Sequence, residues 1–291
     1  MQFKKIALVG KVGSVSIVEH IVHLAEYLHN IGVTVYIDCQ KECAEYIDKK
    51  FEVGELLSWV DKLDLIIVVG GDGTLLSVAR KSVSSRIPIV GINQGKLGFM
   101  TDIAADEMIN GIENIVLNNN YIVESRSLLL AEVYRLDKIE YVSVALNDVV
   151  ISRGAIGNMI EFDIGVDGQF VLSQKSDGVI FSTPTGSTAY SLAAGGPILH
   201  PNAPVFSVIP ICPQSLTNRP LVVSDSSTIE FTLAMENATQ IHFDGQECYD
   251  LVLNDRVVLK KYPEMLKLIH PTEYNYFRTL RKKLDWSKRV S

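Results

Sequence analysis

A single aspartate stands in a glycine-rich turn that directly follows a short apolar run. Residues 65–69 are five consecutive apolar residues, four of them β-branched, which predicts a strand buried on both faces. The turn Gly70–Thr74 follows, and we expect Thr74 to cap a helix that runs to about Val83. Glycines let a ligand approach the backbone, and a helix N-terminus offers N–H groups to an anion. We therefore expect Asp72 to have little steric cover at a ligand site; the alternative is an ordinary turn in which Asp72 is a capping residue.

A pair of polar residues interrupts an apolar segment between residues 140 and 152. Asn147 and Asp148 stand between Leu146 and Val149, where strand propensity disfavours both of them. Neighbouring residues of a strand point to opposite faces, so the two can meet one ligand only at a bulge or a strand end. Such a pair can hydrogen-bond the vicinal hydroxyls of a ribose. The alternative is a turn between two short strands.

Three further segments combine glycines with polar side chains. Gly91–Phe99 follows another apolar strand; it is either a second wall of the crevice beside the first turn or a structural loop. Ser173–Gly178 and Ser182–Pro197 are rich in hydroxyls and glycines, which favours a surface for a flat polar ligand on which Tyr190 stacks. Phe243–Gln246 is either a further part of this site or a plain Asp-Gly hairpin turn.

The composition is that of a soluble protein with two modest cores, since the 291 residues are 47% hydrophobic and 21% charged. No apolar run reaches the roughly 18 residues that span a bilayer, and the N-terminus leads directly into a strand pattern rather than a signal peptide. We therefore expect a cytoplasmic protein with no membrane partner. The net charge of −7 argues against a general nucleic-acid binder.

Several catalytic and metal-binding patterns are missing from the sequence. It contains no GxxxxGK(S/T), HExxH or GxSxG, which argues against a Walker-type nucleotidase, a zincin and an α/β-hydrolase. No GxGxxG follows the first strand, and no metal site built from protein side chains is predicted. The cysteines form neither a CxxC pair nor a metal-ligand spacing, and we expect reduced, buried thiols; they are Cys39, Cys43, Cys212 and Cys248.

The first part of the chain alternates strands with helices, which predicts a doubly wound α/β domain with a parallel, Rossmann-like sheet. Its strands are expected at residues 4–10, 33–38, 65–69 and 87–93, and its helices at 14–30, 74–83 and 104–118, with two short uncertain segments at 42–49 and 54–63. We expect this domain to comprise residues 1–120. A helix in the tail, residues 272–291, is expected to return to it.

From residue 121 to residue 271 the pattern is strand after strand, which predicts an all-β, β-sandwich-like second domain. The expected strands are 121–135, 140–152, 159–164, 169–173, 178–182, 207–211, 221–223, 228–233, 240–243 and 256–260. Asp167-Gly168 and Asn254-Asp255 are expected to be turns. A short helix is expected over residues 189–194.

Taken in order along nearly the whole chain, these motifs resemble those of the NAD kinase family. Gly70–Thr74 looks like the family's GGDGT signature, which lipid kinases and phosphofructokinases share. Asn147-Asp148 falls where the family carries an Asn-Glu pair. Ser176–Pro197 is similar to its more specific DG…STPTGSTAYSLSAGGP segment, and Gly91–Phe99 and Gly245-Gln246 also correspond. Asp148 is one methylene shorter than the family's usual Glu, which reduces its reach.

The resemblance implies an enzyme that transfers the γ-phosphoryl group of ATP to the adenosine 2′-hydroxyl of NAD, giving NADP, with a divalent cation, usually Mg²⁺. It implies that Asp72 is the base and that Asn147 and Asp148 hold the adenosine ribose. A homotetramer or homodimer is implied as well. The remaining implied binding residues are Gly71 and Gly73 beside the nucleotide, Lys175 on the phosphates or ribose, Asp177 toward the nicotinamide, and Thr188, Ala189, Tyr190, Ser191, Leu192, Ala193 and Gln246 along the dinucleotide.

Two rival functions remain open at this point. One is a kinase of a lipid or sugar hydroxyl that shares the glycine-aspartate turn, against which Thr183–Pro197 stands. The other is a non-catalytic NAD-binding regulator, against which the retained Asp72 stands. The range of phosphoryl donors, the use of NADH and the nature of any effector do not follow from the sequence.

Overall fold

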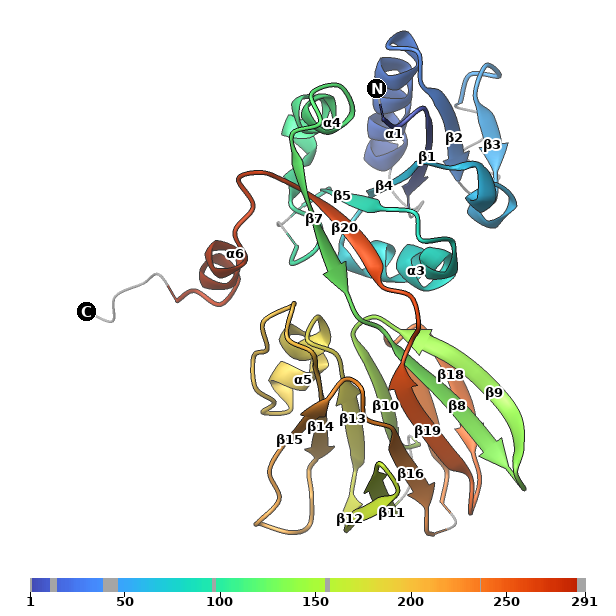
Figure 1. Ribbon diagram of the computed structural model, residues 1–291, viewed down its shortest axis with the longest axis vertical. Coiled ribbons are helices and arrows are strands. Elements are labelled where there is room, and N and C mark those ends of the chain that lie inside the picture. Colours follow the sequence, from blue (N-terminus) through green and yellow to red (C-terminus); the bar gives the residue numbers. More distant parts are fainter. Residues whose placement is uncertain are drawn as a thin grey trace. The chain divides into compact units, whose positions relative to one another are not determined.

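The computed structural model describes residues 2–10, 15–38, 47–95, 98–154, 158–235 and 237–286, with only the backbone of Val15 and Ser16. The chain forms two compact units, residues 1–125 with 266–291 and residues 126–265 (Figure 1). These units differ from the predicted domains 1–120 and 121–271 at both junctions. The reason is that β7 (Tyr121–Arg126) and β20 (Leu266–Pro271) pair with each other as strands of the first sheet.

The first unit contains an eight-stranded sheet of order β3-β2-β1-β4-β5-β20-β7, with β6 paired to β5. Its other strands are β1 (Lys5–Gly10), β2 (Thr34–Asp38), β3 (Glu52–Gly54), β4 (Leu65–Val69), β5 (Ile89–Asn93) and β6 (Ile103–Ala104). The pairs from β3 to β20 are parallel. The chain reverses its direction of travel across the sheet between β1 and β4, the place where such sheets bind ligands.

Helices α1 (Val15–Asn30), α3 (Asp72–Ser82) and α4 (Met108–Val116) pack against this sheet, as the alternating pattern predicts. Helix α6 (Tyr276–Lys283) follows β20, and single 3₁₀ turns lie at Leu56–Ser58, Val60–Lys62, Val83–Ser85 and Ala105–Glu107. All five residues of β4 are buried, and alternate ones pack in one cluster with α1 and α4. The predicted Rossmann-like domain is confirmed.

The predicted tail helix is shorter in the structure. Asn275 caps α6, since its side-chain oxygen accepts a hydrogen bond of 2.9 Å from the Arg278 amide. The helix ends at Lys283, and residues 287–291 lie outside the described residues. The same holds for most of the uncertain segment 42–49 and for Cys39 and Cys43.

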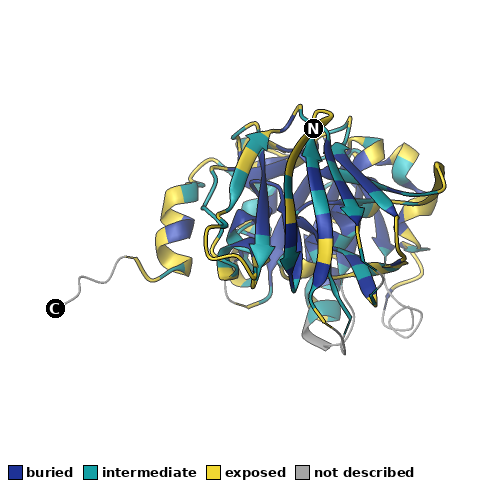
Figure 2. Cartoon of the chain, turned by 90° about the horizontal axis from the view of Figure 1, so that it is seen from below, coloured by how far each residue is buried: buried dark blue, intermediate teal, exposed yellow. Residues whose placement is uncertain are grey.

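The second unit consists of two six-stranded antiparallel sheets, of order β15-β14-β13-β10-β17-β18 and β12-β11-β16-β19-β8-β9. The strands are β8 (Leu129–Arg135), β9 (Lys138–Ala145), β10 (Asp148–Arg153), β11 (Ile160–Val166), β12 (Gln169–Ser176), β13 (Gly178–Ser182), β14 (Val205–Ile211), β15 (Leu221–Ser224), β16 (Ile229–Leu233), β17 (Thr239–Phe243), β18 (Glu247–Leu251) and β19 (Arg256–Lys261). One apolar cluster draws residues from both sheets, and buried and exposed positions alternate along the strands (Figure 2). The predicted β-sandwich-like domain is confirmed.

Two predicted strands are each divided in the structure. Residues 121–135 form β7 and β8, and residues 140–152 belong to β9 and β10, which lie in different sheets. The predicted turn at Asp167-Gly168 is confirmed, with φ of +51° and +74°. The short helix near residue 189 is confirmed as α5 (Tyr190–Ala193), preceded by a 3₁₀ turn at Gly186–Thr188.

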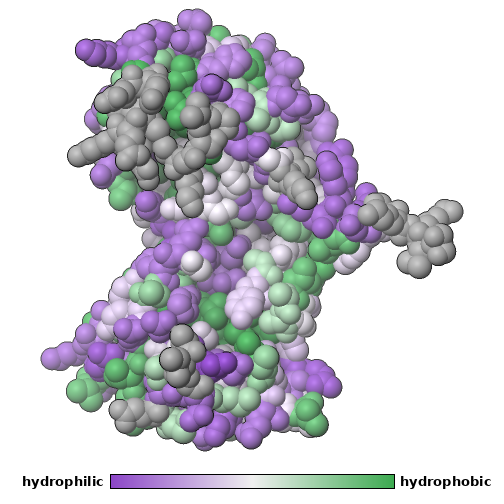
Figure 3. All heavy atoms as spheres, turned by 180° about the vertical axis from the view of Figure 1, so that it is seen from behind, coloured by the Kyte–Doolittle hydropathy of each residue, from purple (hydrophilic) through white to green (hydrophobic). Residues whose placement is uncertain are grey.

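The structure also bears on the predicted burial of the cysteines and on the expected lack of a membrane span. Cys212 and Cys248 are free thiols, but both are exposed, so the expectation of burial is wrong for them; each stands in or beside a strand at a position that faces solvent. Hydrophobic and hydrophilic residues are interspersed on the face that Figure 3 shows. Among the described residues, no helix has the length and apolar character needed to cross a membrane.

Candidate active site

The glycine-rich turn of the first unit carries Asp72 at the carboxyl end of β4. Helix α3 begins at Asp72 rather than after Thr74, because the Gly71 carbonyl accepts hydrogen bonds from the amides of Thr74 and Leu75 at 3.0 and 3.2 Å. The prediction that Thr74 is the N-cap is therefore wrong, and Gly71 occupies that position. Asp72 lies in the first turn of α3, where a negative charge is favourable.

The Asp72 carboxylate is engaged rather than bare. One oxygen accepts the Phe99 amide at 2.8 Å, and the other accepts the amides of Met100 and Thr101, each at 3.2 Å, and the Thr101 hydroxyl at 3.0 Å. The side chain is of intermediate burial. The expectation of little steric cover is thus wrong, because the segment after β5 wraps around this carboxylate. The segment after β5 therefore meets the turn after β4, as its interpretation as a second wall beside that turn requires.

Close packing fixes this arrangement from the side of the β5 segment. A Cβ atom built on Gly98 would overlap the Asp72 carboxylate, 2.7 Å from its carbon atom. The Thr101 hydroxyl also accepts a hydrogen bond of 2.8 Å from the buried Asn93 side chain. Asp72 is therefore held in one orientation by backbone and buried polar groups. Lys96 and Leu97 of the same segment lie outside the described residues.

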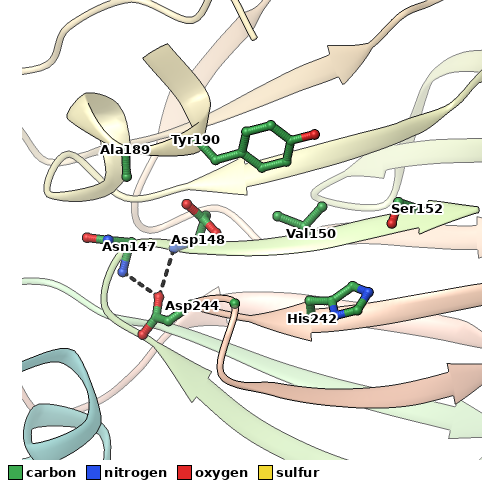
Figure 4. A pocket seen from close by; sticks show the side chains of 9 residues that line it. Asn147, Asp148, Val150, Ser152, Ala189, Tyr190, His242 and Asp244 are labelled. Atoms are coloured by element: carbon green, nitrogen blue, oxygen red, sulfur yellow. Dashed lines mark hydrogen bonds between the residues drawn. The ribbon is translucent and has the colours of Figure 1, made fainter. Parts of the chain in front are cut away.

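The second unit contains a pocket of about 320 Å³ on one sheet. Its walls are Asn147, Asp148, Val150, Ser152, Ala189, Tyr190, His242, Asp244 and Gly245. In Figure 4 the Tyr190 ring lies on one side of β10 and the His242 ring on the other. The pocket therefore has a polar end at Asp148 and a ring-lined middle over Val150.

The alternation of side chains along β10 explains which residues reach the pocket. Asp148, Val150 and Ser152 line it, whereas the alternating residues Val149 and Ile151 belong to the core between the sheets. This is the alternation expected of a strand with two different faces. The pocket thus lies on the outer face of its sheet, away from the sandwich core.

Asn147 and Asp148 reach the same pocket because a strand ends between them. The chain passes from β9 in one sheet to β10 in the other at residues 146 and 147, a segment that we call the crossover. Both interpretations of Asn147-Asp148 are therefore compatible with the structure: the pair lies at a turn between two strands, and both residues line one pocket.

The crossover is held from two sides. The Asp244 carboxylate accepts the amides of Leu146, Asn147 and Asp148 at 2.9, 2.8 and 3.1 Å. From the opposite side, the Thr183 hydroxyl donates to the Leu146 carbonyl at 2.5 Å and the Thr183 amide to the Asn147 carbonyl at 2.9 Å. These hydrogen bonds together restrict the backbone conformation of the crossover.

The pKa of the Asp148 carboxyl is raised to about 7, by burial first and by the charge of Asp244 second. Asp148 is 5% exposed, so its ionised form has lost most of its hydration. A buried carboxyl that titrates near neutrality in a pocket is a common property of functional sites.

We expect Asp148→Asn to stabilise the protein at alkaline pH. The pKa of Asp148 in the folded protein, about 7, exceeds the value of about 3.9 in the unfolded chain. The contribution of the protonated Asp148 carboxyl to the free energy of unfolding is therefore complete below pH ~4 and is lost as pH rises through ~7. The variant should therefore be more stable than wild type by about 2–4 kcal/mol at pH 8 and about equally stable near pH 4. Urea unfolding across this pH range measures the gap, and a gap that does not change with pH would contradict the expectation.

The hydroxyl-rich segment supports the pocket more than it lines it. Ser182, Thr183 and Ser187 are buried, and their hydroxyls bond to backbone carbonyls of the crossover or of their own segment. These three hydroxyls are therefore engaged by the protein backbone rather than presented at a binding surface. Ala189 and Tyr190 are its residues in the pocket wall.

The other predicted binding residues of this unit lie outside the pocket wall. Asp177 forms an ion pair of 2.8 Å with Arg153, which is out of phase with the pocket-lining residues of β10. Lys175 lies on β12. The others follow Asp244 or flank Tyr190 in sequence; they are Thr188, Ser191, Leu192, Ala193 and Gln246.

Val150, Ser152 and His242 are pocket residues that the sequence analysis did not identify. Val150 and Ser152 follow Asp148 at the spacing of two that a strand requires, so the signal was available once β10 began at Asp148. His242 pairs with Val150 across β10 and β17, and this long-range register has no local signature.

The chain matches the family models of the ATP-NAD kinase N-terminal domain over residues 6–121 and of the ATP-NAD kinase C-terminal domain over residues 146–271. A NAD kinase of Laribacter hongkongensis (strain HLHK9) is 48% identical over 295 residues, with 99% of this chain and 98% of that protein covered.

Two solved structures are also similar. Yeast NADH kinase complexed with NADH has a TM-score of 0.88 and 26% identity, with 100% of this chain and 90% of that chain covered. A NAD kinase from Archaeoglobus fulgidus in complex with ATP has a TM-score of 0.74 and 26% identity, with 97% and 98% covered.

Proposed function

The chain belongs to the NAD kinase family and phosphorylates NAD with ATP to give NADP, and we propose that Asp72 is the base in this transfer. The family resemblance that the motifs indicated is confirmed. The observation that carries the role of Asp72 is its fixed orientation, since four hydrogen bonds hold its carboxylate at the end of β4. Pre-positioning of this kind is what phosphoryl transfer requires from a protein.

In this mechanism Asp72 orients the adenosine 2′-hydroxyl and accepts its proton late in the transfer. The transition state is loose, so the protein mainly positions the reactants and stabilises charge. Open space surrounds the positions where Gly71 and Gly73 would carry a Cβ, so a phosphate can approach the backbone at the start of α3. The N-terminal end of α3 also carries the partial positive charge of the helix dipole, which favours a phosphate there.

We propose that the polar end of the pocket holds the adenosine ribose. The Asn147 amide group can donate and accept, and the ionised Asp148 carboxylate accepts hydrogen bonds from hydroxyl groups. Asp148, which is one methylene shorter than the family's usual Glu, lines this pocket as the first residue of β10. The Tyr190 and His242 rings lie on the two sides of the same pocket.

A divalent cation fits this site as a partner of the nucleotide. Among the described residues, no group of three or more His, Cys, Asp or Glu side chains is arranged to hold a metal ion. Mg²⁺ is commonly held by phosphates, water and one or two carboxylates instead of a protein cage. Among the described residues, the Asp72 carboxylate is the side chain at the proposed phosphate site that could bind the cation. The cation would offset negative charge on the triphosphate.

Several further roles are proposed on the family resemblance. Lys175 and Asp177 would lie toward the phosphates and the nicotinamide, and Gln246 and the residues around α5 would lie along the dinucleotide. A cytoplasmic homotetramer or homodimer is proposed as well. Large apolar side chains are exposed on the two edge strands of one sheet, Ile139 and Val142 on β9 and Phe170 on β12, which suits contact with another copy; sedimentation equilibrium would measure it.

The test of the reaction is an assay with ATP, Mg²⁺ and NAD. We expect NADP to form, and we expect no product with NAD that lacks the adenosine 2′-hydroxyl, because the attacking oxygen is then missing. A lipid or sugar kinase would leave NAD unchanged and phosphorylate a different alcohol. A non-catalytic regulator would bind NAD, measured by calorimetry, without forming NADP. Phosphorylation of the 2′-deoxy substrate would show that another hydroxyl is attacked.

A further inference from the structure

We propose that Asp244 is a positioning residue for NAD: its carboxylate binds the amides of the crossover and of Asp148, the first residue of β10, so that Asn147 and Asp148 face one ribose. The inference rests on the proposed role of Asn147 and Asp148 as the ribose-binding pair. Asp244 acts through these two residues and has no part in the transfer of the phosphoryl group.

The geometry explains why an acidic residue is needed at this place. The amides of Leu146, Asn147 and Asp148 converge on the two oxygens of Asp244 at 2.8–3.1 Å, and Figure 4 shows two of these bonds. A carboxylate offers acceptors only, whereas an amide side chain would turn a donor toward at least one N–H group. Three charge-assisted hydrogen bonds to one side chain strongly restrict the backbone that they connect.

The turn at Asp244-Gly245 brings this carboxylate back over the crossover. Asp244 and Gly245 both adopt left-handed conformations, with φ of +52° and +63°. The Asp244 amide also donates to the Asp148 carbonyl at 3.0 Å. Asp244 therefore binds the same residue through its own backbone and through its side chain, and the end of β17 is locked to the start of β10.

The second consequence of Asp244 is electrostatic. Its negative charge contributes, after burial, to the raised pKa of Asp148. The other titratable groups that face this pocket are His242 on β17 and Tyr190 on α5. Because the ionised form of Asp148 accepts the ribose hydroxyls, we expect kcat/KM for NAD to fall as pH drops below about 7.

The test is Asp244→Asn, with Asp167→Asn as a matched control. Asn tolerates the left-handed backbone at residue 244, so the variant changes the acceptor and its charge rather than the turn. Asp167 has φ of +51°, is followed by a glycine with φ of +74°, and accepts one backbone amide at 2.8 Å, but it lies in the β11–β12 turn. Both variants thus lose a turn carboxylate, and the variant at residue 244 also disturbs the crossover.

We expect Asp244→Asn to weaken NAD binding, measured by calorimetry without ATP, by about 10- to 100-fold. In the assay, KM for NAD should rise more than kcat falls, and the acidic limb of the kcat/KM profile should move to lower pH. The control should match wild type in affinity and in pH profile. If Asp244→Asn does not fold, Asp244→Glu, which retains the charge, is measured in the same way and should bind NAD more weakly with little change in the acidic limb.

Two outcomes would overturn the proposal. Normal NAD affinity with an unmoved acidic limb in a folded Asp244→Asn variant would show that Asp244 positions nothing. Equal losses in the Asp244 and Asp167 variants would show a general effect on stability. Asp148→Asn separates this proposal from the one on which it rests: if that variant binds NAD normally, the ribose site itself is misassigned, whereas impaired Asp148→Asn beside normal Asp244→Asn refutes only the inference on Asp244.

Discussion

Replacing Asp72 by asparagine is expected to lower kcat by about 10²- to 10⁴-fold while the fold is retained. The substitution keeps the size of the side chain but removes the carboxylate that we propose accepts the proton of the 2′-hydroxyl. It also turns an amide donor toward one of the backbone amides of Phe99, Met100 and Thr101 that the carboxylate accepts. NAD affinity should change little, because the proposed ribose site is the pocket of the second unit.

The control for this variant is Thr101→Val, which removes one of the four hydrogen bonds to Asp72, together with the one that the Thr101 hydroxyl accepts from Asn93, and leaves the charge of Asp72 in place. We expect that variant to lose less than about tenfold in kcat, because only one of the four hydrogen bonds to Asp72 is lost. Single-turnover measurements with ATP, Mg²⁺ and NAD would compare the two. Near-wild-type turnover by Asp72→Asn would disprove the role of base, and equal losses in both variants would show that Asp72 matters only as the anchor of the segment after β5.

The strand and turn around Asp72 could be predicted because their signals are local. A run of five apolar residues followed by glycines is sufficient to predict a buried strand and a tight turn. The environment of the carboxylate could not be predicted in the same way, since its partners Phe99 and Thr101 are 27 and 29 residues away. The polar groups on those residues are mainly backbone amides, which every sequence contains.

The crossover shows a similar limit. Polar residues at 147 and 148 mark an irregularity in an apolar segment, but not that the chain changes sheets there. That change depends on β10 pairing with β13 and β17, and it is stabilised by Asp244, 96 to 98 residues away from the amides that it accepts. Asp-Gly at 244–245 is also typical of an ordinary hairpin turn, so the sequence does not indicate that the Asp244 side chain binds the crossover.

The structural role of the hydroxyls in this segment could not be predicted from the sequence, for a physical reason. Serine and threonine are favoured both where a ligand is bound and where buried backbone groups need partners. The composition of a segment does not distinguish these two cases, whereas the burial of its side chains in the folded protein does. In the structure Thr183 serves the crossover backbone, so the segment contributes to the site chiefly by holding other residues in place.

Gly186→Ala is expected to destabilise the protein by about 3 kcal/mol and to weaken NAD binding by at least roughly tenfold. A Cβ atom on Gly186 would overlap the Asn147 carbonyl group and lie 2.8 Å from the Asn147 Cα atom. These are backbone atoms, so no side-chain rotation relieves the overlap. The crossover would have to move, although Asp244 and Thr183 hold it from two sides.

The control is Gly165→Ala in β11 of the same unit, where the nearest atoms to a new Cβ are at 3.4 and 3.9 Å, ordinary contact distances. We expect that variant to stay within about 1 kcal/mol of wild type and to bind NAD normally. Urea unfolding and calorimetric titration of both variants measure the two effects together. If Gly186→Ala were as stable as Gly165→Ala, the backbone at Asn147 would be freer than these contacts imply. If it lost stability but bound NAD normally, the position of Asn147 would not limit ribose binding, because the methyl group acts on that residue first.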